Sequence, residues 1–78
     1  MNEKYGISAQ MKERIENSFT YHSPKEDQPQ RYVILRDTAK ELAFLILANT
    51  PMGREQSSAI TKLEEAIMWA NKAIACGE

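Results

Sequence analysis

The sequence predicts an all-α protein, in which a short N-terminal helix precedes a long antiparallel helical hairpin. In residues 29–49 and 54–75, apolar side chains recur at alternating steps of three and four, the period of helices packed along a common seam. The short segment between them contains Pro51 and Gly53, which interrupt helical geometry. Two matching helices joined by a short turn favour an antiparallel pair, and residues 1–78 are interpreted as one domain.

The first helix is predicted over residues 8–18. Ile7, Met11, Ile15 and Phe19 recur every fourth residue and form a narrow apolar stripe. The stripe is short, and a helix of this length is marginal in isolation.

A loop is predicted over residues 19–28. The stretch from residue 20 to residue 30 holds two prolines, no aliphatic side chain and many polar groups. Long loops are uncommon in so small a domain and are often functional.

The second and third helices carry the predicted hairpin seam. Its positions are Tyr32, Leu35, Ala39, Leu42 and Ile46, then Ile60, Leu63, Ile67, Ala70 and Ile74. Thr50 and Ser57 are alternative N-caps of the third helix, and Gly77 is a plausible stop. Phe44, Leu45 and Leu47 lie off the seam, so one partner helix cannot cover the second helix.

The length of the chain favours self-association. A chain of 78 residues buries only about 60% of the surface that its unfolded form exposes. Cys76 is the single cysteine and His22 the single histidine, so neither an internal disulfide nor a metal ligand set is expected. We therefore predict a homo-oligomer that needs no cofactor and no metal.

The charge pattern excludes several classes of partner. Ten basic and eleven acidic residues are mixed along the chain, for a net charge of −1, and no basic stripe forms. Binding to duplex DNA is therefore not expected, whereas a small ligand with two or three phosphates is compatible with this pattern. No apolar run approaches the roughly 20 residues of a membrane span, and no signal peptide is apparent, so an intracellular protein is expected.

The sequence does not predict an enzyme. Ser23 adjoins the only imidazole, His22, but neighbours in sequence rarely supply the geometry of a catalytic triad. Glu64 and Glu65 diverge by about 100° on a helix and are most simply a solvated face. The three glycines are isolated, so no glycine-rich phosphate loop is present.

An aromatic and cationic cluster is the strongest sign of function. Tyr21, His22 and Lys25 lie in the predicted loop, and Arg31 and Arg36 follow on the second helix. Aromatic rings stack on nucleobases, and arginine and lysine contact phosphates. The residue chemistry alone also allows a plainer interpretation, in which the nearby rings belong to the core and the cations are solvated.

Two stretches resemble the phage anti-CBASS protein 2 family. Residues 50–75 carry the pieces TPxxREQS, TKLEEAxMWAN and AIA, and residues 19–32 carry FTYH, PK, DQP and RY. The resemblance implies a homohexameric sponge in the cytoplasm of an infected bacterium. Such sponges hold cyclic dinucleotides, such as 3′,3′-cyclic GMP-AMP, and cyclic trinucleotides intact, so that CBASS effectors are not activated. The related anti-Thoeris sponges share the hairpin.

The resemblance also implies roles for individual residues. Tyr21 matches a loop tyrosine that stacks on the dinucleotide bases, and Arg36 falls where the family has a basic residue, usually lysine, that contacts the ligand. His22 and Lys25 are further candidates beside the tyrosine. The candidates for the trinucleotide pocket are Arg54 with Thr50 or Gln56. Two alternatives stay open: a protein-interaction module that binds a host protein, and a purely structural oligomer.

Overall fold

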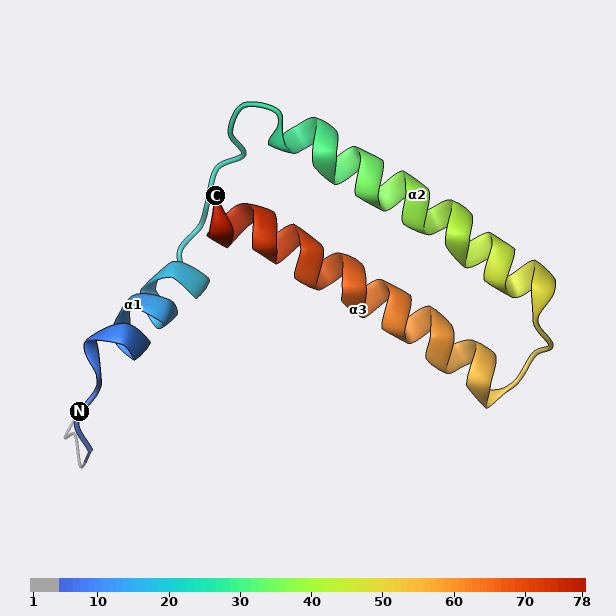
Figure 1. Cartoon of the computed structure of the whole chain (residues 1–78), viewed down its shortest axis with the longest axis horizontal. Coiled ribbons are helices and arrows are strands. Elements are labelled where there is room, and N and C mark those ends of the chain that lie inside the picture. Colours follow the sequence, from blue (N-terminus) through green and yellow to red (C-terminus); the bar gives the residue numbers. More distant parts are fainter. Residues whose placement is uncertain (1–4) are drawn as a thin grey trace.

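The computed structural model describes residues 5–78, and this part of the chain is helical without any strand. Its three helices are α1 (Ala9–Ser18), α2 (Gln28–Asn49) and α3 (Arg54–Gly77). The helices α2 and α3 lie side by side and antiparallel, and α1 projects away from the open end of this hairpin (Figure 1). The predicted all-α fold with a helical hairpin is confirmed.

The helix α1 begins one residue later than predicted because Ser8 is its cap. Ser8 has extended backbone geometry, and its Oγ accepts a hydrogen bond from the Met11 amide at 3.1 Å. The helix ends at Ser18, where the Phe19 amide donates to the Ile15 carbonyl at 3.0 Å. The connection to α2 covers residues 19–27, since α2 already starts at Gln28. We call it the 19–27 loop.

The start of α3 corrects the sequence prediction, because neither Thr50 nor Ser57 caps this helix. The N-cap is Gly53, whose φ of +156° is a backbone conformation that other residues rarely adopt. Its carbonyl accepts from the Ser57 amide at 3.1 Å, which starts the helical ladder. The far end of α3 includes Gly77, the residue predicted as a stop.

The seam between α2 and α3 follows the predicted positions with one correction. Leu42 is 46% exposed, whereas Ala43 is half-buried on the side that faces α3. A straight helix turns every 3.6 residues, so its inner face drifts away from a strict seven-residue repeat. At this point the drift moves the seam from Leu42 to Ala43. All other predicted seam positions are half-buried.

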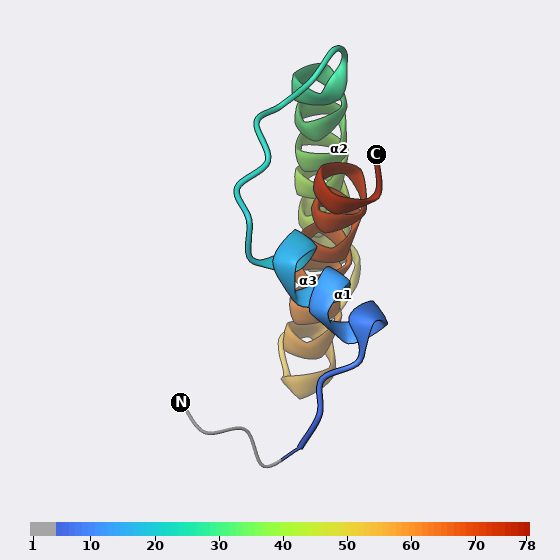
Figure 2. The same cartoon turned by 90° about the vertical axis from the view of Figure 1, so that its left-hand side faces the viewer.

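The described chain has no apolar core of its own. None of its hydrophobic residues is buried, and the one buried side chain is that of Gln28. The radius of gyration is 17.7 Å, whereas a compact chain of this length would have about 12 Å. Seen from the open end, α2 and α3 form a single layer, and the loop before α2 runs along its side (Figure 2). Surface such as that of Phe44 and Trp69 therefore stays uncovered within one chain. Among the described helices, none combines the length and apolar character that crossing a bilayer requires.

Candidate functional site

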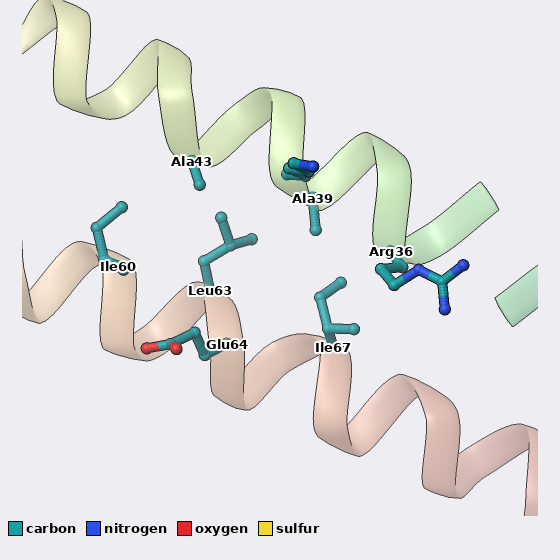
Figure 3. Close-up of a pocket in the computed structure, with 8 residues that line it drawn as sticks. Arg36, Ala39, Ala43, Ile60, Leu63, Glu64 and Ile67 are labelled. Atoms are coloured by element: carbon teal, nitrogen blue, oxygen red, sulfur yellow. The ribbon is translucent and has the colours of Figure 1, made fainter. Parts of the chain in front are cut away.

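A groove of about 410 Å³ runs between α2 and α3 near the middle of the hairpin (Figure 3). Small side chains on α2 leave room there, while branched side chains on α3 form the opposite wall. The lining residues are Arg36, Ala39, Lys40 and Ala43 from α2, and Ile60, Leu63, Glu64 and Ile67 from α3. The floor is therefore apolar, and the charged groups lie at the rim.

Two cations from α2 line this groove. The Arg36 side chain is 70% exposed, and its Nε lies 3.9 Å from the Asp37 carboxylate, which is near the limit of an ion pair. Lys40 lies one turn further along α2 and makes no ion pair within the described residues. The sequence analysis missed Lys40, although its spacing of four from Arg36 places both on one face of the helix.

Arg31, by contrast, is already occupied by carboxylates. Its guanidinium donates to both oxygens of Glu78, at 2.5 and 2.6 Å, and lies 3.1 Å from Asp27. The hydrogen bonds from Arg31 and Gln28 lower the pKa of Glu78 to about 2, and those to Glu78 raise the pKa of Arg31 further. A ligand phosphate would have to displace these partners, so Arg36 is the more available arginine.

The 19–27 loop holds three of the predicted ligand residues at the open end of the hairpin (Figure 1). Tyr21 is 82% exposed, which leaves its ring faces accessible. His22 is half-buried, and its Nε2 donates to the Asn17 carbonyl at 2.8 Å. Lys25 is fixed through its backbone amide, which donates to Gln28 Oε1 at 3.0 Å.

The turn of the hairpin brings together two of the residues predicted for a trinucleotide pocket. Gln56 Nε2 donates to both the carbonyl and the hydroxyl of Thr50, each at 3.0 Å. The Thr50 hydroxyl in turn donates to the Ile46 carbonyl at 2.7 Å. Arg54 is exposed at the first position of α3, two residues before Gln56 along the chain.

The residues predicted for the dinucleotide fall in two places on one chain. Arg36 lines the groove, whereas Lys25 lines a separate hollow with Gln28, Arg31 and Glu78. Tyr21 lies between α1 and that hollow along the chain. No group of His, Cys, Asp and Glu in the described part of the chain is arranged to hold a metal ion. A ligand that contacts both the loop and the groove would thus have to span these two places on one chain or bind between two protomers.

Comparison with known families adds a match to the hairpin itself. A family model described as "Acb2/Tad1, hairpin domain" matches residues 11–75, which is well over half of the chain. The chain belongs to the Acb2/Tad1 hairpin family. Neither a curated protein nor a solved structure matches it.

The Acb2/Tad1 match confirms the family resemblance found in the sequence. It spans most of α1, the 19–27 loop and nearly all of the hairpin, and it includes every residue predicted to bind a ligand. Membership of the Acb2/Tad1 family supports a role against bacterial defence, with a cyclic oligonucleotide as the kind of ligand. The assignments of individual residues stay predictions.

Proposed function

We propose that this protein is a sponge that binds cyclic dinucleotides and cyclic trinucleotides and keeps them from the effectors of bacterial CBASS defence. The observation that carries the proposal is the Acb2/Tad1 family match over residues 11–75. The signal is bound and released intact, so the protein is not an enzyme and uses no cofactor. It acts as a homo-oligomer, a hexamer, in the cytoplasm of the infected bacterium.

Binding of a dinucleotide would combine stacking with neutralisation of charge. The exposed ring of Tyr21 offers a face for a base, and stacking of this kind contributes about 1–3 kcal/mol per base. Arg36 at the rim of the groove would contact a phosphate, and Lys40 adds a second cation on the same face. His22 and Lys25 flank the stacking position. Two protomers would then supply the two walls of the pocket.

The first test is calorimetry of the purified protein with 3′,3′-cyclic GMP-AMP. Tyr21→Ala is expected to weaken binding by at least about 1 kcal/mol, since it removes the stacking face. Tyr5→Ala, outside the matched region, is the control of the same residue type and should bind normally. Chromatography of the released nucleotide should recover it unchanged. Degradation of the nucleotide would contradict sequestration, and normal binding by Tyr21→Ala would contradict the assignment of Tyr21.

Reversal of charge tests the role of Arg36. Arg36→Glu should weaken dinucleotide binding more than Arg36→Lys, because lysine keeps the charge and glutamate repels a phosphate. Arg14→Glu, an exposed position on α1, controls for the change in net charge. Equal losses in the two Arg36 variants would show that charge is not what matters at this position.

The turn would hold the trinucleotide, with Arg54 as the cation and Thr50 and Gln56 as hydrogen-bonding groups. The hydrogen bond of 3.0 Å between Gln56 and Thr50 supports a shared site for these two residues. Titration with a cyclic trinucleotide in the presence of saturating dinucleotide tests whether the two sites are separate. If neither class of nucleotide binds or raises the Tm, the exposed apolar face of α2 would favour the alternative, a module that binds a host protein.

A further inference from the structure

The last turn of α3 contacts both ends of the 19–27 loop. Carbonyl groups in the last turn of a helix lack partners within the helix. Here the Cys76 carbonyl accepts a hydrogen bond from Asn17 Nδ2 at 3.0 Å, and the Ile74 carbonyl accepts from Gln28 Nε2 at 3.4 Å. Asn17 lies on α1 just before the loop, and Gln28 is the first residue of α2.

Gln28 is the stronger of the two attachments. It is 5% exposed and is the only buried side chain in the described chain. Its side-chain Nε2 also donates to Glu78 Oε1 at 3.0 Å, and its side-chain Oε1 accepts from the backbone amide of Lys25 at 3.0 Å. Buried polar groups are costly unless they are hydrogen-bonded, and this side-chain amide has three partners, Lys25 in the loop and Ile74 and Glu78 at the end of α3.

The attachments continue into the loop from both sides. The backbone carbonyl of Asn17 accepts from His22 Nε2 at 2.8 Å. The backbone amide of Gln28 donates to the backbone carbonyl of Lys25 at 2.8 Å. Between Lys25 and Gln28, Glu26 has a φ of +46°, which is uncommon for a residue other than glycine. Such a conformation persists where the surroundings hold it, so the bonds to Gln28 determine the shape of this part of the loop.

We infer that Asn17 and Gln28 are positioning residues, which clamp the two ends of the 19–27 loop to the last turn of α3 and so fix how Tyr21 is presented to a ligand. The inference rests on the proposed function for the role of Tyr21, but the clamp itself is a property of the free protein. Gln28 lines the hollow that holds Lys25, whereas Asn17 does not, so Asn17 is the cleaner test of a positioning role.

The test is hydrogen exchange of the backbone amides, followed by NMR in the free full-length protein. Asn17→Ala and Gln28→Ala should each accelerate exchange in the 19–27 loop by about threefold to tenfold, the equivalent of one hydrogen bond. Gln28→Glu keeps the size of the side chain and its acceptor, but it loses both donors and places a carboxylate beside Glu78. It should open the loop as well, which a role in packing alone would not produce. Gln30→Ala, an exposed glutamine on α2, is the matched control and should change nothing.

Binding of 3′,3′-cyclic GMP-AMP is then measured for the same variants. Affinity should fall by about the factor by which loop exchange rises, again roughly threefold to tenfold. Faster loop exchange with unchanged affinity would overturn the positioning role, and unchanged loop exchange would overturn the clamp. If Gln28→Ala accelerates exchange throughout the hairpin, Asn17→Ala decides the matter, because this exposed residue loses a single side-chain bond. If the unmodified protein binds no cyclic nucleotide, the proposed function fails while loop exchange still tests the clamp.

Discussion

The open end of the hairpin and its turn are held by different kinds of contact. At the open end, Arg31 bonds Glu78 across 47 positions of the sequence, and Asn17 bonds Cys76 across 59. At the turn, Thr50 bonds Ile46 across four positions and Gln56 across six. The turn is thus a local structure, whereas the geometry of the open end depends on contacts among the end of α1, the start of α2 and the end of α3.

The two ends also differ in what they leave exposed. The open end buries the polar side chain of Gln28 and pairs Arg31 with Asp27 and Glu78. Toward the turn, α2 carries four large exposed apolar side chains, Leu42, Phe44, Leu45 and Leu47, whereas its first half carries two, Val33 and Ile34. Large exposed apolar surfaces mark sites of interaction. We therefore expect association to depend on the half of the hairpin near the turn.

The largest expected effect is the loss of association when a charge enters this apolar surface. Phe44 and Leu45 are 63% and 59% exposed, and adjacent residues on a helix point about 100° apart, so separate glutamate substitutions test two faces. At least one of Phe44→Glu and Leu45→Glu should dissociate the oligomer in sedimentation velocity, because burial of each apolar side chain contributes about 1.5–3 kcal/mol.

The control for these variants places the same charge at the other end of the same helix. Gln30→Glu should leave the oligomer intact, since Gln30 is polar and exposed. A monomeric unmodified protein would contradict the whole argument for association. If Gln30→Glu dissociates the oligomer and both apolar variants leave it intact, the contact surface lies at the open end instead.

A smaller effect is expected from acid at the open end. Glu78 has a pKa of about 2 instead of 4.5, because Arg31 and Gln28 stabilise its carboxylate. A carboxylate whose pKa is lower in the folded state binds fewer protons there than when unfolded, so its contribution to stability is complete above pH 4.5 and is lost as the pH falls toward 2.

Thermal unfolding between pH 5 and pH 2 measures this contribution. Glu78→Gln should lower the Tm at pH 5 and reduce the further fall in Tm on acidification. Glu65→Gln removes an exposed carboxylate from the middle of α3 and should keep the slope of the unmodified protein. The same slope in Glu78→Gln and the unmodified protein would show that the pair of Arg31 and Glu78 does not contribute to stability.

The contrast between local and distant contacts explains what could be predicted from the sequence. The hairpin, its turn and nearly all seam positions follow from periodicity and from the geometry of Pro51 and Gly53, which act over a few residues. The N-cap of α3 was missed because Thr50 and Ser57 favour caps by residue type, whereas the backbone of Gly53 decides where the helix starts. The prediction that Leu42 lies on the seam was wrong, because the inner face of a helix with 3.6 residues per turn drifts away from a strict seven-residue repeat.

The candidate site divides in the same way. The resemblance named Tyr21 and Arg36, and spacing alone points to Lys40. No local pattern pairs Gln28 with Ile74, or Asn17 with Cys76, because those bonds need the folded hairpin. Nor could the sequence show that Arg31 is occupied by Glu78 while Arg36 is available, since both arginines lie on α2 with carboxylates nearby.

The smallest expected effect is at the turn, from the change Thr50→Val. Valine keeps the branched shape and suits the extended backbone of Thr50 (φ −133°, ψ 149°), so the variant removes only the hydroxyl and its bonds to Ile46 and Gln56. Unfolding by denaturant should show a loss of about 1 kcal/mol. Thr61→Val, at an exposed position on α3, is the control and should be neutral. Because the bonds of Thr50 are local, the exchange of the 19–27 loop should not change; faster loop exchange in this variant would show that the two ends of the hairpin are coupled and that the turn is not self-contained.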